Sequence, residues 1–178
     1  EDLHDILFFF FSTGLAVGSS GTIVKTIDGG ANWNFIFSGI GENLYNLHKT
    51  SGNKIYVCGA NAKIAFSTNN GDTWTDVPNS FTGLGYDFKL IQSFGTDTLI
   101  ISTNQPYLVT TYDNGLSWNL VNNGGATDNT AMYFSNSMTG FTGTSIGEIY
   151  STVDGGINWS LELQTNGNDP INCIKFTD

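Results

Sequence analysis

Carboxyl and amide side chains recur in this sequence at a fixed place in a short motif. The motif runs from a Ser or Thr to a Trp, and its third position holds Asp28, Asn69, Asp113 or Asp154. Oxygens of this kind can bind metal ions or act as catalytic acids and bases. Consecutive copies are 41, 44 and 41 residues apart, so each falls in a separate structural unit and the four oxygens would lie far apart. We therefore interpret them as structural residues, and we expect no metal site and no cofactor.

The motif has the composition of a tight turn that leads into a strand. Its Asp or Asn can accept hydrogen bonds from backbone N–H groups of the same turn. A Gly two positions later tolerates a positive φ. A Trp ends each copy, and we expect its ring to be buried against a neighbouring unit. These residues are Trp33, Trp74, Trp118 and Trp159.

Composition excludes several classes of function. The 178 residues carry a net charge of −10, with six Lys and no Arg. Such a chain has no basic face to neutralise phosphates, so we exclude nucleic-acid binding. The apolar run 6–11 is too short to cross a membrane, and we expect no membrane insertion. The acidic, polar composition favours a secreted, extracytoplasmic protein.

Cysteine and histidine give no further site. Cys58 and Cys173 occupy different places in their repeats, and two cysteines alone do not show whether they are free thiols or a disulfide. The only histidines are His4 and His48, which leaves no metal-ligand spacing.

Aligning the four motifs reveals four short apolar runs in every repeat, each bounded by Gly, Asn, Asp or Ser. Four antiparallel strands every 40-odd residues describe one blade of a β-propeller. The sequence therefore predicts an all-β fold in one propeller segment, residues 1–178. We expect the blades at about residues 3–43, 44–86, 87–128 and 129–170, with 171–178 as the first strand of a fifth blade.

A fifth first strand is not needed by a ring that closes with four blades. We expect this chain to be part of a larger ring, because an arc of blades exposes two faces that need partners. The alternatives are that a second chain completes the ring or that the last strand covers an open end.

Ligands of propellers usually bind at the face that carries the connections between blades and the turns between second and third strands. In this chain those loops are rich in Asn, Gly and Thr and carry a few aromatic and acidic residues. Such a surface could stack a sugar or hold a peptide. The candidate ligand face consists of Phe81, Tyr86, Tyr107, Asp128 and Glu148.

The repeated motif resembles a known sequence pattern. S/T-x-D-x-G-x-S/T/N-W is the Asp-box, or BNR repeat, of β-propellers, and here it occurs four times in register. The stretch from Gly14 to Gly30 resembles the photosystem II assembly/stability factor-like propellers and related secreted bacterial repeat proteins. The resemblance implies that the boxes are fold elements remote from the ligand face. The basic Arg-rich patch implicated in partner binding by photosynthetic members is missing here.

The same resemblance frames the choice between binding and catalysis. Asp-box sialidases need an arginine triad, which this chain does not contain. Asp-box xyloglucanases use two acidic residues across a cleft, and no motif marks such a pair here. We expect a non-catalytic binding or scaffolding module of a secreted bacterial protein, with a protein or a neutral glycan as its partner. The alternative is a fragment of a xyloglucanase-like glycoside hydrolase whose acid and base lie partly outside this chain.

Overall fold

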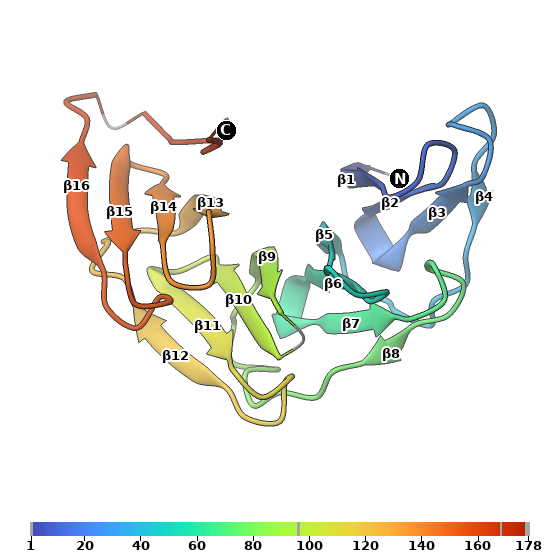
Figure 1. Cartoon of the computed structure of the whole chain (residues 1–178), viewed down its shortest axis with the longest axis horizontal. Coiled ribbons are helices and arrows are strands. Elements are labelled where there is room, and N and C mark those ends of the chain that lie inside the picture. The colour runs from blue at the N-terminus through green and yellow to red at the C-terminus, as the bar shows by residue number, and fades with distance from the viewer. Residues whose placement is uncertain (1, 96, 168, 177–178) are drawn as a thin grey trace. The chain divides into compact units, whose positions relative to one another are not determined.

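The computed structural model describes residues 2–95, 97–167 and 169–176 (Figure 1). In these residues the chain forms four sheets of four antiparallel strands each, and two single-turn 3-10 helices. This confirms the predicted all-β fold built of propeller blades. No helix in the described ranges is long and apolar enough to cross a membrane. The chain divides into two compact units, unit 1 (residues 1–91) and unit 2 (residues 92–178).

Unit 1 contains two complete sheets with the orders β1-β2-β3-β4 and β5-β6-β7-β8. The 3-10 helices η1 (Ser19–Gly21) and η2 (Ala60–Ala62) form the turns between the second and third strands. The strands are β1 (Leu3–Phe8), β2 (Gly14–Gly18), β3 (Ile23–Thr26), β4 (Asn34–Phe35), β5 (Leu44–Lys49), β6 (Ile55–Gly59), β7 (Ile64–Ser67) and β8 (Thr75–Asp76).

Unit 2 contains the sheet β13-β14-β15-β16 and most of the sheet β12-β11-β10-β9. Strand β9 (Phe88–Phe94) begins in unit 1 and ends in unit 2. The other strands are β10 (Thr98–Thr103), β11 (Tyr107–Thr111), β12 (Asn119–Asn122), β13 (Asn129–Phe134), β14 (Gly140–Thr144), β15 (Glu148–Thr152) and β16 (Ser160–Gln164).

The apolar core of unit 1 lies between its two sheets. Strands β2 and β6 are central in their sheets and are rich in aliphatic side chains, which suit a pleated surface that is covered on both faces. Leu15 and Val17 of β2 belong to one buried cluster with Leu44 and Leu47 of β5. The first strand of the second sheet therefore packs on the second strand of the first sheet.

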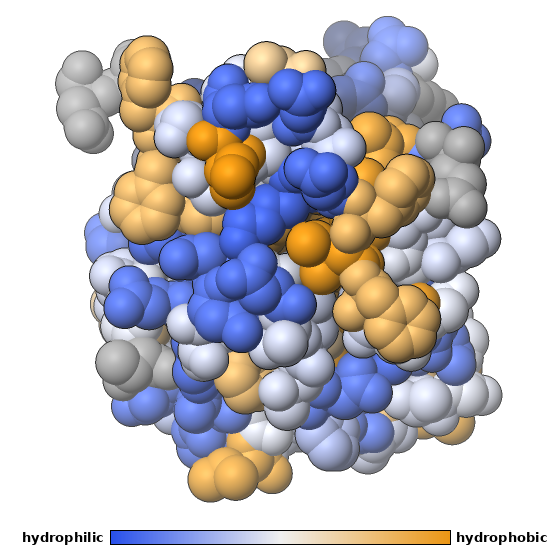
Figure 2. Space-filling model, turned by 90° about the vertical axis from the view of Figure 1, so that its right-hand side faces the viewer, coloured by the Kyte–Doolittle hydropathy of each residue, from blue (hydrophilic) through white to orange (hydrophobic). Residues whose placement is uncertain are grey.

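The corresponding face of the first sheet is exposed. Leu3 and Ile6 hold the places in β1 that Leu44 and Leu47 hold in β5. Leu44 and Leu47 are 0% and 5% exposed, whereas Leu3 and Ile6 are 54% and 56% exposed. Figure 2, which views the side of the molecule where β3 and β4 lie in Figure 1, shows apolar surface among polar surface. Because no described residue of this unit covers β1 as β2 covers β5, its apolar side chains remain in water.

Polar side chains also join the first strands of successive sheets. The Asp5 carboxylate of β1 accepts hydrogen bonds from the Leu47 backbone N and from Asn46 Nδ2 of β5, both at 2.7 Å. Asn46 Oδ1 in turn accepts a hydrogen bond from the Ile91 N of β9 at 2.9 Å. Burial raises the pKa of Asp5 above its ordinary value, against the effect of these donors.

The stretch after β16 contacts β13 as a further first strand would. Thr130, the second residue of β13, donates a hydrogen bond from Oγ1 to the Ile171 carbonyl at 2.8 Å. In unit 1, the second residue of β1, His4, places Nδ1 at 2.8 Å from the Leu44 carbonyl. Residues 171–176 form no strand pair in the described chain, and their assignment as the start of a fifth blade stays a prediction. The last two residues of that predicted strand lie outside the described part.

The four motif tryptophans are half-buried. Trp33 and Trp159 make edge-to-face contacts with Phe8 and Phe134 of their own sheets, at 5.9 Å between ring centroids. Trp74 packs against the cluster shared by the two sheets of unit 1. For Trp33 and Trp159, burial against a neighbouring unit stays a prediction. Their aromatic partners end the first strand of the same sheet, because the turn after that strand lies beside the motif turn.

Two glycines at the same position of their boxes give a matched test of this packing. Gly71 has φ +85°, and a Cβ there would lie 2.6 Å from Leu15 Cδ1, whereas Gly30 has φ +96° and a Cβ there would lie no closer than 3.8 Å to a non-adjacent residue. We expect Gly30→Ala to lower the free energy of unfolding by about 1 kcal/mol, from the unfavourable φ alone. Gly71→Ala should lower it by about 2–4 kcal/mol, because steric overlap adds to that strain. Equal losses in urea unfolding would show that the contact with Leu15 does not constrain this turn.

Candidate functional site

The Asp-box turns satisfy their own polar groups. In the first box Asp28 Oδ1 accepts hydrogen bonds from Thr26 Oγ1 at 2.8 Å and from the Asn32 backbone N at 2.9 Å. Thr26 Oγ1 also accepts a hydrogen bond from the Gly30 backbone N at 2.9 Å. The other three boxes repeat these contacts, including the second, where Asn69 replaces Asp.

These donors shift the acidity of the box carboxyls. Hydrogen bonds from Asn32 and Thr26 lower the pKa of Asp28 to about 2. Bonds from Ser117 and Thr111 do the same for Asp113. The pKa of Asp154 is also about 2, through its bonds from Asn158 and Thr152. The described residues contain no group of three His, Cys, Asp or Glu side chains that could hold a metal ion.

The loop side of unit 1, which carries η1, η2 and the connections between sheets, holds a pocket of about 290 Å³. One connection is longer than the others. From the motif Trp to the next first strand the chain takes 14 positions between Trp74 and Phe88, but 11 between Trp33 and Leu44 and 11 between Trp118 and Asn129. The extra residues help to wall the pocket. It is lined by Glu42, Asn61, Ala62, Lys63, Ile64, Asp76, Val77, Pro78, Asn79 and Thr82.

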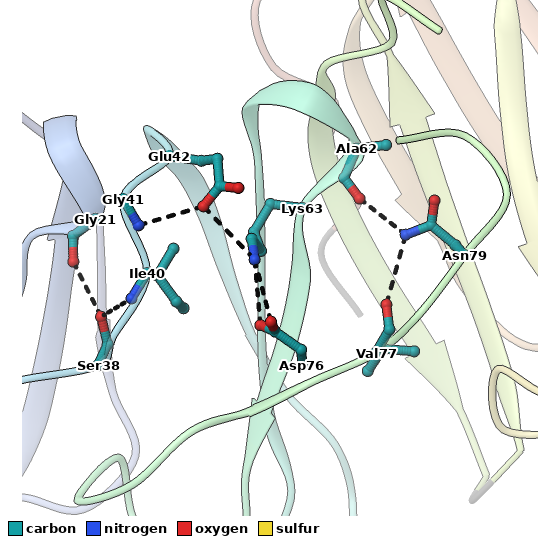
Figure 3. A network of polar contacts seen from close by, with 10 residues as sticks. All are labelled: Gly21, Ser38, Ile40, Gly41, Glu42, Ala62, Lys63, Asp76, Val77 and Asn79. Atoms are coloured by element: carbon teal, nitrogen blue, oxygen red, sulfur yellow. Dashed lines mark hydrogen bonds and ion pairs between the residues drawn. The ribbon is translucent and has the colours of Figure 1, made fainter. Parts of the chain in front are cut away.

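Lys63 lies at the centre of the polar contacts in this pocket (Figure 3). Its Nζ is 3.3 Å from both carboxylate oxygens of Asp76 and 3.5 Å from Glu42 Oε2. The Lys63 side chain is largely buried, whereas that of Asp76 is mostly exposed. The pocket thus presents two carboxylates to one ammonium group, and its net charge is negative.

Asparagine side chains hold the walls of the pocket in place. Asn79 Nδ2 donates to the Ala62 carbonyl at 2.9 Å, which ties the long connection to η2 (Figure 3). Asn61 Oδ1 accepts a hydrogen bond from the Gly83 backbone N at 2.8 Å. Asn61 itself has φ +52°, a conformation that Asn tolerates better than most residues. The shape of the pocket is therefore fixed by bonds within the chain.

A row of aromatic and cationic side chains, which we call the row, lies beside this pocket along the first strands. The rings of His4 and Tyr45 are 5.4 Å apart, and Lys89 Nζ lies 3.9 Å from the centre of the Tyr45 ring. Lys89 Nζ is also 3.3 Å from Asp87 Oδ2. Asp87 Oδ1 accepts a hydrogen bond from the Asn61 backbone N at 3.1 Å, so the row and the pocket share one network.

Two residues of the predicted ligand face lie in this region of unit 1. Phe81 is only 8% exposed and packs edge-to-face on Tyr86 and Phe88. Tyr86 is half-buried. The structure brings the two together, but as supports of the long connection rather than as a free stacking surface.

The other three predicted residues lie in unit 2. Tyr107 begins β11 and Asp128 precedes β13, and both are half-buried. Glu148 is buried, and its Oε2 accepts a hydrogen bond from the Tyr150 hydroxyl at 3.1 Å. Burial and then Glu148 raise the pKa of Tyr150 above its ordinary value.

Neither the pocket nor the row was predicted from the sequence, although the sequence carries a signal of each. The 44-residue spacing between the second and third boxes marks the long connection. His4, Tyr45 and Lys89 occupy one column of the repeat, the second position of each first strand. In these three repeats this position holds aromatic and cationic side chains, whereas the position before it is apolar. Such a position indicates side chains that lie next to one another on the loop side.

Comparison with known proteins places this architecture in a family. A family model described as the photosynthesis system II assembly factor YCF48 matches residues 1–133. The chain belongs to the YCF48 family. A search of curated proteins finds no match to this sequence.

Solved structures share the fold of this YCF48-family chain. YCF48 from Cyanidioschyzon merolae superposes with a TM-score of 0.74 at 20% identity, over 98% of this chain and 59% of that one. A structure described as YCF48 bound to D1 peptide gives 0.72 at 21% identity, over 92% and 54%. An ancestral GH74 enzyme gives 0.70 at 18% identity, over 88% and 23%. This chain therefore spans little more than half the length of the YCF48 structures.

The low pKa values of the box carboxyls predict acid-dependent stability. Because the folded-state pKa of about 2 lies below the ordinary 3.8, the boxes stabilise the fold fully above about pH 4. That stabilisation is lost as the pH falls towards 2. We expect urea midpoints measured from pH 6 to pH 2 to fall less steeply below pH 4 when Asp28, Asp113 and Asp154 are replaced by Asn.

The second box provides the matched control. Asn69→Asp adds a carboxyl to the same turn and should steepen the loss below pH 4. Burial lowers the pKa of His48 to about 4, so its contribution is lost between pH 6.5 and 4, in a separate window. Unchanged profiles in the Asn and Asp variants would mean that the boxes do not hold their carboxyls in the charged form.

Proposed function

We propose that this chain is a non-catalytic propeller module that binds an extended polypeptide on the loop side of unit 1. The observation that carries the proposal is the pocket around Lys63, with its rigid walls and its excess of carboxylate. A basic side chain of a bound peptide would pair with Glu42 and Asp76, and the mostly exposed Asp76 is open to it. Membership of the YCF48 family and the D1 peptide bound by one member support a polypeptide ligand.

A polypeptide fits this region better than a neutral glycan does. Sugars bind by stacking on exposed aromatic faces, and here Phe81 is buried under the long connection. The GH74 likeness extends to the fold alone, at 18% identity. The pocket carboxylates Glu42 and Asp76 share one ammonium group, which is an ion-pair network and not an acid and a base facing each other across a sugar.

The test is peptide binding by pocket variants. We would select ligands from an array of random 12-residue peptides and measure their affinity by fluorescence anisotropy. Glu42→Gln combined with Asp76→Asn should weaken binding at least about tenfold, since both charge-assisted contacts are lost. Asp2→Asn, which removes an exposed carboxylate outside the pocket, should leave the affinity unchanged.

Two results would contradict the proposal. One is equal binding by the pocket variant and the control variant for every selected peptide. The other is release of reducing sugars from xyloglucan by the wild-type chain, which would favour the glycoside hydrolase alternative.

We also propose that another blade covers the exposed face of β1, either from the rest of a longer protein or from a second chain. The burial of Leu44 and Leu47 by β2 supports this, because Leu3 and Ile6 present the same residues without cover. In sedimentation velocity we expect the 178-residue chain to self-associate, and Leu3→Ser with Ile6→Ser to reduce that association. Leu84→Ser, at an exposed residue of the long connection, is the control. A wild-type chain that stays monomeric at high concentration would exclude a second copy of this chain as the source of that blade.

A further inference from the structure

Unit 2 carries exposed apolar side chains on its box side, the side of the Asp-box turns and the turns after the first strands. Leu116 and Ile157 hold the same position in the third and fourth boxes and are 88% and 59% exposed. Tyr112 and Val153 share another position of these boxes, and Val153 is 76% exposed. Met138, in the turn between β13 and β14, is also exposed. We call these five residues the box patch.

Contacts bring the members of the box patch together around the fourth box. The Tyr112 hydroxyl reaches from the third box to the Gly155 carbonyl of the fourth, at 3.4 Å. The Gly155 backbone N donates to the Met138 carbonyl at 2.8 Å. Val153 and Ile157 lie on either side of Gly155 in the same turn. The turns that carry these side chains are thus adjacent, and Leu116 lies in the same turn as Tyr112.

The fold does not need apolar residues at these positions. In the second box the corresponding residues are Thr68 and Asp72, and that turn keeps the hydrogen bonds of the others. The box satisfies its polar groups through its Ser or Thr and its Asp or Asn, so these shared hydrogen bonds do not depend on the side chains at the two variable positions. Leu, Ile, Val and Tyr placed there expose apolar surface that costs solubility, and grouped exposed apolar residues mark interaction sites.

The charges around the box patch select the partner. Unit 2 has eight acidic residues and one basic residue, Lys175. Asp113 and Asp154 sit in the same turns as the apolar residues, and Asp97 lies beside the third box through a bond from the Asn114 N to its carbonyl at 2.8 Å. The hydrogen bonds of the boxes keep Asp113 and Asp154 charged to about pH 2. An anionic membrane would be repelled, and a second copy that met this patch with its own unit 2 would bring like charges to it.

From this combination we infer that the box patch docks a basic amphipathic polypeptide segment, with its apolar face on Leu116, Val153 and Ile157 and its cations beside Asp113 and Asp154. This site lies in unit 2 and on the box side, whereas the proposed pocket lies in unit 1 and on the loop side. The two proposals therefore stand or fall separately.

The experiment uses a labelled 18-residue peptide of Lys and Leu with the Leu residues at helical spacing. A second peptide has the same composition but disperses the Leu residues. Fluorescence anisotropy with the complete chain should show at least about tenfold tighter binding of the first peptide. Binding should also weaken as sodium chloride is raised from about 50 to about 300 mM, because screening reduces the attraction between exposed charges.

The decisive variant is Leu116→Asp combined with Ile157→Asp. It copies the residue that the second box holds at this position, so the turns should fold. We expect it to weaken binding of the amphipathic peptide at least about tenfold, although it adds two negative charges. Ala31→Asp makes the same change in the first box and should leave the affinity unchanged.

Each alternative has its own outcome. Attraction by charge alone would make the Leu116→Asp, Ile157→Asp variant bind as tightly as the wild type or more tightly, and this would overturn the inference. Self-association of the wild type that the same variant abolishes, measured by sedimentation equilibrium, would assign the patch to a second copy and would overturn it as well.

Discussion

The packing of a first strand onto the second strand of the preceding sheet is the contact on which the rest of unit 1 depends. Leu44 and Leu47 of β5 are removed from water by Leu15 and Val17 of β2. This burial fixes how the two sheets pack. The hydrogen bonds of Asp5 and Asn46 then fix the position of each first strand along its axis relative to the next first strand. The row of His4, Tyr45 and Lys89 follows from that alignment, since each is the second residue of its strand or column.

The two sides of the sheets are built by different means. On the box side every turn closes on its own hydroxyl and its own Asp or Asn. On the loop side of unit 1 the connections are held by long-range bonds, such as the one from Asn79 to the Ala62 carbonyl. A turn that closes locally leaves its variable residues free for contacts with other molecules. A connection that is held from outside can instead form the wall of a pocket.

Much of the fold could be predicted because its determinants are local and repeated. The Asp-box shows its hydrogen-bonding residues in eight consecutive positions, and its recurrence gives the number of sheets. The candidate site was harder to predict from the sequence, because its determinants are contacts between residues far apart in the chain. Phe81 was chosen as an exposed aromatic residue in a loop, but its burial depends on Tyr86 and Phe88, which a loop sequence does not reveal. The importance of Lys63 depends on its ion pairs with Glu42 and Asp76, which the sequence alone does not reveal.

The presence of Asn69 in the second box has a consequence for how such chains diversify. An amide there makes the same bonds to its hydroxyl partner and to the backbone as the carboxylates do. The charge of a turn and its two outward residues can therefore change in one repeat while the other repeats stay as they are. When a blade is duplicated, the new copy keeps the hydrogen-bonded turn. Substitutions at the outward positions of that turn can then change the binding specificity of one repeat without affecting the others.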